Sequence, residues 1–280
     1  MSGFSPDWLA LREPADHAAR DPGLVAALAR ALRGPVRAVD LGCGSGSNLR
    51  ALAPHLGPDQ DWVLVDHDPA LLIAARSRLA AWAERAEAAD DGLVLRRDGA
   101  RIAVRFSALD LAAGPEAALE EAPHLVTAAA LFDLVSEAWI AALARAVAAA
   151  GAVFYTALTY DGAEDWTPPH PADAAIHAAF LAHQGGDKGF GPSLGPAATE
   201  ALARAFQAHG YAVETATSPW RLGRGEAALL HQLAEGTARA AAETGRVAAE
   251  EAEAWREARR APGTGAVIGH RDLLAVPPSA

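Results

Sequence analysis

Three glycines at alternate positions form the clearest chemical motif of the chain. Gly42, Gly44 and Gly46 follow a short apolar segment at residues 36–41, and a helical pattern begins at about Ser47. Glycines in a turn between a strand and a helix permit positive φ angles and let a ligand lie against the backbone. The spacing therefore predicts a ligand-binding turn at the carboxyl end of a buried first strand.

The residues around this turn narrow the choice of ligand. Asp40 precedes it, and Ser47 stands where the dinucleotide pattern G-x-G-x-x-G/A requires glycine or alanine. A carboxylate at this position suits a ligand with an ammonium group and repels a pyrophosphate. A P-loop requires Gly-Lys-Ser/Thr, which does not follow here. The motif favours a cationic ligand over a dinucleotide.

Residues 39–48 resemble motif I of the class I S-adenosylmethionine-dependent methyltransferases. The resemblance implies a Rossmann-like α/β fold with a mostly parallel seven-stranded sheet, an antiparallel last strand, an inserted lid and a helical arm. It also implies S-adenosyl-L-methionine as the cofactor. The cofactor-binding residues that it suggests are Asp40, Gly42, Cys43, Gly44, Gly46, Asn48, Asp66, His67, Asp110, Leu111 and Ala129.

The resemblance also assigns roles to these residues. Asp40 and the glycine turn would hold the methionine part, and Asp66 would bond the ribose hydroxyls. His67 would pack on the adenine or lie in a surface loop. The Asp110 side chain and the Leu111 amide would bond the adenine. Carbonyls of residues 128–130 would lie near the sulfonium.

The elements that position these residues alternate between strand and helix, which implies a mostly parallel sheet covered on both faces. Asp98-Gly99 predicts an additional hairpin beside the third strand. The expected strands are 36–41, 62–65, 93–95, 102–106, 124–130, 152–158, 210–216 and 265–276. The expected helices are 8–33, 47–55, 69–88, 115–121, 136–150, 196–209 and two within 224–260, split at Gly245.

Residues 159–195 interrupt this alternation, with only a short helix expected near residues 172–183. A long irregular segment that contains aromatic residues favours a substrate lid over disorder. A histidine there could act as a general base and the lysine could bind an anion, although each histidine could equally be a solvated loop residue or a helix cap. The catalytic candidates are His170, His183, Asp187 and Lys188.

Three further residues are candidates for substrate binding: Arg12, Tyr160 and Trp166. Arg12 stands four residues before Asp16, so an intrahelical pair is the preferred interpretation of its position. His270 and Asp272 alternate along the closing strand and are interpreted as structural.

The sequence lacks the motifs that are typical of several classes of methyl acceptor. The amine-binding sequence Asn/Asp-Pro-Pro-Phe/Tyr is absent after the fourth strand, and the single cysteine, Cys43, lies inside the glycine turn. Asp133 and Asp161 could be metal ligands, but no Asp-Asn pair accompanies them, so no metal is expected. The net charge of −11 disfavours nucleic acid.

These features favour methyl transfer to an oxygen or nitrogen of a small polar metabolite. The alternatives are a methyltransferase that acts on RNA or protein and a non-catalytic cofactor-binding subunit. The cytoplasm is expected as the location, since the first residues lack the features of a secretory signal and no apolar run is long enough for a membrane span. A homodimer through residues 219–261 is possible.

The chain is expected to divide into a helical cap, a cofactor-binding core, a lid insertion, a second part of the core, a helical arm that forms a lid or a dimer interface, and a closing strand with a tail. The corresponding ranges are 1–34, 35–158, 159–195, 196–218, 219–261 and 262–280.

Overall fold

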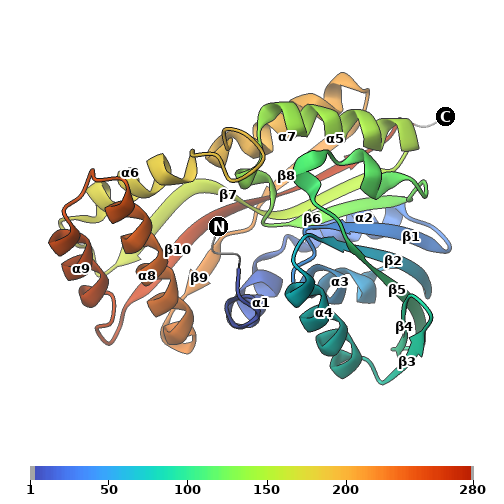
Figure 1. Cartoon of the computed structure of the whole chain (residues 1–280), viewed down its shortest axis with the longest axis horizontal. Coiled ribbons are helices and arrows are strands. Elements are labelled where there is room, and N and C mark those ends of the chain that lie inside the picture. Colours follow the sequence, from blue (N-terminus) through green and yellow to red (C-terminus); the bar gives the residue numbers. More distant parts are fainter. Residues whose placement is uncertain (1–3, 279–280) are drawn as a thin grey trace.

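The computed structural model describes residues 4–278. Within them one ten-stranded sheet has the order β3-β4-β5-β2-β1-β6-β7-β10-β8, and β9 pairs with β10 (Figure 1). The strands are β1 (Val36–Leu41), β2 (Asp59–Asp66), β3 (Arg85–Ala89), β4 (Gly92–Arg97), β5 (Ala100–Ala108), β6 (Leu125–Ala129), β7 (Val153–Thr167), β8 (Ala212–Thr217), β9 (Trp220–Leu222) and β10 (Gly265–Val276).

Nine α-helices accompany the sheet in this part of the chain. They are α1 (Pro6–Ala19), α2 (Pro22–Ala31), α3 (Ser47–Leu52), α4 (Pro69–Trp82), α5 (Glu137–Ala150), α6 (Asp173–Gln184), α7 (Ala198–Ala208), α8 (Ala227–Glu243) and α9 (Ala249–Ala258). Measured over residues 4–278, every helix is too short or too polar for a membrane crossing.

The strand order creates a natural binding edge. β5, β2, β1, β6 and β7 are parallel neighbours, whereas β10 runs antiparallel between β7 and β8. The chain turns outward in opposite directions from β1 and β6, so the carboxyl ends of these two strands form a switch point where such sheets bind ligands. The expected mostly parallel sheet with an antiparallel last strand is confirmed.

Helices cover both faces of this sheet and create two apolar cores. α2, α3 and α4 bury leucines such as Leu28, Leu49 and Leu79 against one face. α5 and α7 bury Leu143 and Phe206 against the other. Figure 1 shows α5 and α7 on the side of the sheet opposite α3 and α4. Because helices pack on both faces, the strand ends next to the glycine turn are held in place.

The prediction of one helix over residues 8–33 is wrong, because the helix is interrupted at Arg20 and Asp21. The Asp21 side chain accepts a hydrogen bond from the Leu24 amide and caps α2, and Pro22 occupies the first turn of that helix. An Asp-Pro pair of this kind begins a new helix. α1 is thereby free to cross the sheet edge in its own direction.

Two other predicted helices are shorter than expected. The helix over residues 69–88 ends at Trp82, and Arg85–Ala89 forms the edge strand β3 against β4. Pairing with a neighbouring strand overrides the helix propensity of its alanines. The helix expected over residues 115–121 is a single 3₁₀ turn at Glu116–Leu119.

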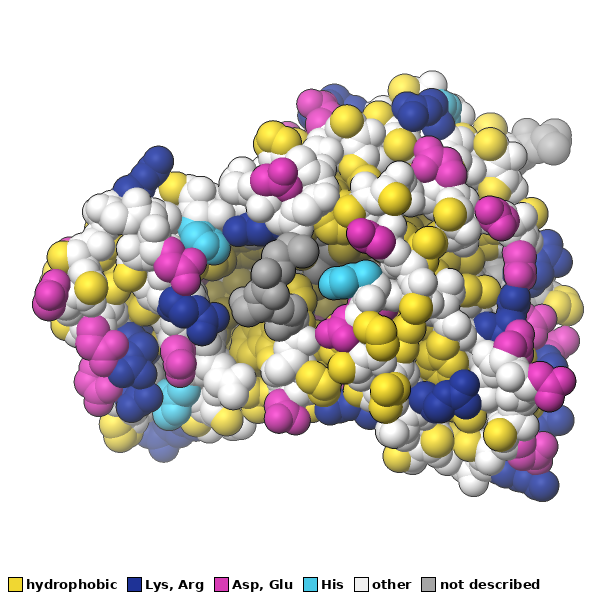
Figure 2. Space-filling view, viewed as in Figure 1, with side chains coloured by type: hydrophobic (Ala, Val, Ile, Leu, Met, Phe, Trp, Pro, Cys, Tyr) yellow, Lys and Arg dark blue, Asp and Glu magenta, His cyan; other side chains and the backbone are white. Residues whose placement is uncertain are grey.

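The fifth strand is longer than the predicted residues 152–158, because β7 continues to Thr167 while paired with β10. The far halves of these two strands (residues 159–167 and 265–270) carry β9, α6, α8 and α9, and we refer to this part as the extension. It lies to one side of the main sheet in Figure 1. Figure 2 shows the molecular surface hollowed between the extension and the main sheet.

Gly92→Ala is expected to destabilise the edge hairpin strongly. A Cβ at this position would lie 1.8 Å from the Val104 carbonyl oxygen, which is backbone and cannot rotate away. Overpacking typically costs about 1–3 kcal/mol, and a backbone clash belongs at the upper end. Urea unfolding measures the loss. Gly225→Ala is the matched control, because its Cβ meets nothing within 4 Å; equal stability of the two variants would contradict the packing argument.

Candidate active site

The glycine turn adopts a backbone that only glycine tolerates well. Gly42, Gly44 and Gly46 have φ angles of 64°, 52° and 76°. A Cβ on Gly44 would lie 2.9 Å from Leu9 Cδ1 of α1, and a Cβ on Gly42 would lie 3.4 Å from Leu131 Cδ1. The turn is therefore enclosed by α1 and by the segment that follows β6.

Asp66 joins the ends of the first two strands. One carboxylate oxygen accepts from the Gly44 amide at 2.9 Å, and the other accepts from the Asp68 amide at 3.0 Å. The residue is buried, whereas the neighbouring His67 side chain is 64% exposed and lies 3.5 Å from Asp66 through its Nδ1. The carboxylate thus faces the turn from the adjacent strand.

Asp40 is fully buried beneath the turn. Its Oδ1 accepts from Asn48 Nδ2 at 2.7 Å, and the same amide donates to Thr127 Oγ1 at 3.1 Å. Its Oδ2 has no hydrogen-bond partner among the described residues. Burial raises the pKa of Asp40 to about 7, although Asn48 and Arg20 oppose the shift. An unpartnered buried carboxylate oxygen is costly, and a cation would relieve it.

Cys43 is an unsuitable nucleophile. Its side chain is buried, and burial raises the pKa of the thiol, with Asp40 and Asp66 raising it further. The thiolate is the reactive form of cysteine, so this residue serves to pack the turn.

The residues assigned to the adenine lie beside Asp66. The Leu109 amide donates to the Asp66 carbonyl at 3.1 Å, which brings the end of β5 against the end of β2. Asp110 is exposed and accepts from the Ala112 amide at 2.9 Å, whereas Leu111 is buried and its carbonyl accepts from Trp139. Ala129 is the last residue of β6. The structure therefore gathers the predicted cofactor residues along one sheet edge.

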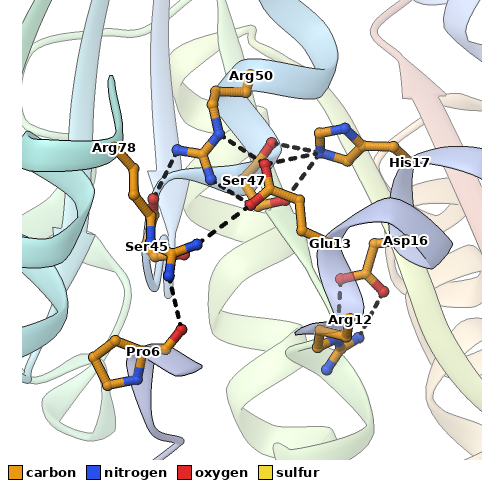
Figure 3. Close-up of polar contacts among 9 residues, drawn as sticks. All are labelled: Pro6, Arg12, Glu13, Asp16, His17, Ser45, Ser47, Arg50 and Arg78. Atoms are coloured by element: carbon orange, nitrogen blue, oxygen red, sulfur yellow. Dashed lines mark hydrogen bonds and ion pairs between the residues drawn. The ribbon is translucent and has the colours of Figure 1, made fainter. Parts of the chain in front are cut away.

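Helix α1 is fastened over the turn by a polar network (Figure 3). Glu13 accepts from Arg50 Nε and Nη2 at 2.7 and 2.6 Å, and Arg50 Nη1 donates to the Ser45 carbonyl. Burial would raise the pKa of Glu13, but the pair with Arg50 outweighs it and the pKa is lowered. His17 Nε2 lies 2.9 Å from Ser47 Oγ. The network joins α1 to the last residues of the turn and to α3.

Arg12 pairs with Asp16 in a two-pronged contact at 2.9 and 3.1 Å, which confirms the expected intrahelical pair. Trp220 Nε1 donates to the same Asp16 at 3.0 Å, and the Arg12 guanidinium lies 4.9 Å from the Trp220 ring centre. α1 and β9 together fix the direction of this guanidinium.

A second polar group lies beyond the glycine turn, after the end of β6 and beside the middle of β7. Asp133 follows β6 in a 3₁₀ turn and accepts from Gln184 Nε2 of α6 at 3.0 Å. Burial raises the pKa of Asp133 to about 6, and its own amide, Arg12, Gln184 and the Tyr160 amide oppose that shift. The Tyr160 ring lies 6.1 Å from the His270 ring. Burial and, to a smaller extent, the Arg12 charge lower the pKa of His270 to about 3.

The four catalytic candidates of the segment 159–195 bond to residues of that segment and of α8. His183 Nε2 lies 3.0 Å from Glu243, and Lys188 Nζ donates to the His183 carbonyl. Asp187 accepts from the Gly189 and Gly191 amides, and His170 Nδ1 accepts from the Ala172 amide. A catalytic role for any of them stays a prediction.

Tyr160 and Trp166 occupy different surroundings, although both are on β7. The Tyr160 hydroxyl lies 3.3 Å from His177 Nε2, in the group near Asp133. Trp166 packs against Trp255 and donates to Glu164, inside the extension. Of the two, Tyr160 is the one whose backbone amide bonds Asp133.

The sequence did not assign Gln184 or His270 to the site, and Asp133 was considered only as a metal ligand. His270 is confirmed as a buried strand residue, yet its Nδ1 has no hydrogen-bond partner among the described residues. Asp133 carried a usable signal, because it is the single charge within the apolar run at residues 131–135. A single carboxylate within such a run is expected to be buried near the end of the preceding strand.

No protein-family model matches the chain, and no curated protein matches it. Among solved structures it is similar to a cyclopropane-fatty-acyl-phospholipid synthase-like protein from Lactobacillus casei, with 16% identity, a TM-score of 0.53, and coverage of 93% of this chain and 91% of that chain. It is also similar to a SAM-dependent methyltransferase from Geobacter sulfurreducens in complex with S-adenosyl-L-homocysteine (16% identity, TM-score 0.49, coverage 99% and 100%). A third is a cyclopropane synthase from Mycobacterium tuberculosis (12%, 0.49, 97% and 94%).

The strand order and the likeness to the first of these structures agree in what they imply about architecture. β5-β2-β1-β6-β7-β10-β8 form the seven-stranded sheet, and the hairpin partners β3 and β4, together with β9, are additions to it. The chain has the class I methyltransferase fold.

Proposed function

We propose that the chain binds S-adenosyl-L-methionine at the glycine turn and transfers its methyl group to an oxygen or nitrogen of a small polar metabolite. The observation that carries this proposal is the pair of buried carboxylates, Asp40 and Asp66, on adjacent strand ends around a turn of three left-handed glycines. Asp40 beside the turn repels the pyrophosphate of a dinucleotide and attracts an ammonium group, and Asp66 is suited to accept from ribose hydroxyls.

The residues present fit this cofactor. The unpartnered Oδ2 of Asp40 would accept from the ammonium group, and Asp66 would accept from the ribose hydroxyls. Asp110, Leu111 and His67 border the same edge and would surround the adenine. When bound, the cofactor supplies an electrophilic methyl group on a sulfonium centre. α1 covers the turn through Leu9 and the Glu13–Arg50 pair and would exclude water from it.

The net charge of the chain and the position of the extension and α1 around the site both favour a small acceptor. The net charge of −11 opposes the approach of a polyanion such as RNA. The extension and α1 flank the hollow of Figure 2, which leaves a space between elements and not a flat surface. The chemistry needed of the protein is alignment of the acceptor and removal of its proton.

Calorimetric titration tests cofactor binding directly. S-adenosyl-L-homocysteine is expected to bind the purified chain, and NADH is expected not to bind. The first ligand presents the ammonium and ribose groups that Asp40 and Asp66 would hold, whereas the second presents a pyrophosphate to them. Binding of NADH without binding of S-adenosyl-L-homocysteine would overturn the proposal.

A further inference from the structure

Five side chains from five elements converge beside the glycine turn. The segment after β6 brings Asp133 to the turn, because Leu131 packs on Gly42 and Asp133 follows two residues later. Arg12 lies one turn along α1 from Leu9, the residue that packs on Gly44. We call this group the acceptor cluster; its members are Arg12, Asp133, Tyr160, Gln184 and His270.

Asp133 is the one negatively charged member of the acceptor cluster, and the nearby Arg12 only partly offsets the cost of its burial. The charge of Arg12 is paired with Asp16 at 2.9 Å, and Trp220 holds Asp16 in place. Gln184 and Tyr160 are uncharged, and His270 is neutral at physiological pH because burial lowers its pKa to about 3. Asp133 remains, 8% exposed, with a neutral amide as its side-chain partner. A buried carboxylate whose charge is only partly offset favours a cationic ligand.

His270 supplies an independent sign of a ligand. It is 5% exposed, and its Nδ1 has no hydrogen-bond partner among residues 4–278. Its ring lies 5.0 Å from the Trp220 ring and 6.1 Å from the Tyr160 ring. A buried polar atom without a partner is uncommon, and a ligand N–H is one group that would satisfy it. The aromatic rings around it suit an organic cation.

Burial changes the pKa of an ammonium group and the pKa of a hydroxyl in opposite directions. It raises the pKa of Asp133 to about 6 and would lower the pKa of an ammonium group held beside it. The two values therefore approach each other, and proton transfer to the carboxylate becomes easier. For a hydroxyl, burial raises the pKa because the alkoxide is the charged form, and it raises the pKa of Asp133 for the same reason. The two values shift in the same direction, so burial does not bring a hydroxyl closer to its base.

We propose that the acceptor is a small-molecule amine, and that Asp133 binds its ammonium group and takes a proton from it. This inference rests on the proposed function and selects nitrogen over oxygen. The proton moves from the ammonium nitrogen to a carboxylate oxygen of Asp133, which frees the nitrogen lone pair. That lone pair forms the new N–C bond to the methyl group as the C–S bond breaks and its electron pair stays on sulfur. The methylated ammonium and the neutral thioether then leave, and Asp133 returns its proton to solvent.

Several groups face Asp133 and bear on its protonation. Arg12 approaches from α1, the Tyr160 amide from β7, and Gln184 from α6. Behind these lie Asp16, which pairs with Arg12, His270 of β10, whose pKa Arg12 lowers, and His177 of α6 at the Tyr160 hydroxyl. With His270 neutral and Arg12 permanently charged, Asp133 is the group of the cluster that changes charge near pH 6. Activity that requires the Asp133 carboxylate should fall as the pH decreases through about 6.

The experiment offers methyl-labelled S-adenosyl-L-methionine and matched pairs of small molecules to the full chain. Each pair shares a skeleton and differs only in an amine or a hydroxyl: propylamine and propanol, alanine and lactate, phenylethylamine and phenylethanol, phenylalanine and phenyllactate. Label is expected in at least one amine and in no hydroxyl partner. Label in a hydroxyl partner, or none in any compound while S-adenosyl-L-homocysteine binds, overturns the inference. Failure of S-adenosyl-L-homocysteine to bind overturns the proposed function instead.

Asp133→Asn tests the residue. The substitution keeps the shape and the Gln184 contact, so the affinity for S-adenosyl-L-homocysteine should not change. kcat with the labelled amine should fall on the order of 100-fold, within the range for loss of a general base. Asp61→Asn, an exposed carboxylate at the far end of β2, is the matched control and should retain full activity.

A binding measurement separates proton transfer from a structural role. Titration of the labelled amine into protein saturated with S-adenosyl-L-homocysteine, near pH 6 in buffers of different ionisation enthalpy, should reveal proton release as the ammonium displaces the proton of Asp133. Asp133→Asn should abolish this release. Equal proton release in both proteins would show that Asp133 does not hold the ammonium group.

Discussion

Asp66→Asn is expected to weaken S-adenosyl-L-homocysteine binding on the order of 100-fold. The carboxylate oxygens of Asp66 accept from the Gly44 and Asp68 amides, and an asparagine offers only one accepting oxygen. Its NH₂ group would face a backbone donor, and the ribose would lose a charged partner. Hydrogen bonds to a charged group contribute about 1.5–3 kcal/mol each, and a loss of about 3 kcal/mol is roughly a 100-fold change in affinity. Calorimetric titration measures this change.

Asp68→Asn is the control for this substitution. Asp68 caps α4 by accepting from the Ala70 amide, and asparagine is an equally good cap. The variant removes the same charge two residues away and leaves the Asp66 contacts in place. Its affinity should remain within a few-fold of the wild-type value. Wild-type affinity in Asp66→Asn would show that this carboxylate does not hold the ligand.

The conformation of the glycine turn was predictable because it depends on neighbouring residues in the sequence. Glycines at alternate positions after an apolar strand require left-handed backbone, and Gly42, Gly44 and Gly46 adopt it. Closing strand β10 also has the predicted bounds, 265–276. Its two apolar stretches lie between Gly263 and Pro277, which mark where a strand can begin and end. In both places the sequence neighbours alone decide the structure.

The interruption of the first helix was missed although its signal was present. Asp21-Pro22 is a cap followed by a first-turn proline, but the leucines at helical spacing suggested one continuous helix. Residues 85–89 were unpredictable for a different reason, because their strand depends on pairing with β4 and not on their own propensity. Element boundaries that depend on a neighbour cannot be deduced from one segment.

The acceptor cluster illustrates the limit for a site. Arg12, Asp133 and His270 are separated by more than a hundred residues from one to the next, and only the packed sheet edge brings them together. The resemblance to a family implies cofactor residues because members of that family share a cofactor. It implies no acceptor residues, since acceptors differ between members, so the acceptor residues proposed above rest on burial and missing hydrogen-bond partners.

Arg259→Met is expected to destabilise the chain by about 3 kcal/mol. The Arg259 guanidinium is 1% exposed, pairs with Asp173, and donates to the Pro168 carbonyl. It also lies 5.2 and 5.0 Å from the ring centres of Trp166 and Trp255. Loss of one partner of a buried ion pair costs about 3–5 kcal/mol, and the 30% exposure of the Asp173 side chain places the cost at the lower end. Urea unfolding measures the change.

Arg256→Met provides the comparison, since Arg256 lies in α9 three residues before Arg259, the C-cap of that helix, and pairs with Glu253 on the surface. Exposed pairs contribute little, so this variant should unfold close to the wild-type midpoint. Both variants should bind S-adenosyl-L-homocysteine as tightly as the wild type, because Arg259 contacts residues of the extension and not the glycine turn. Equal loss of stability in the two variants would show that helix content, and not the buried cation between two tryptophans, holds α9 to β7.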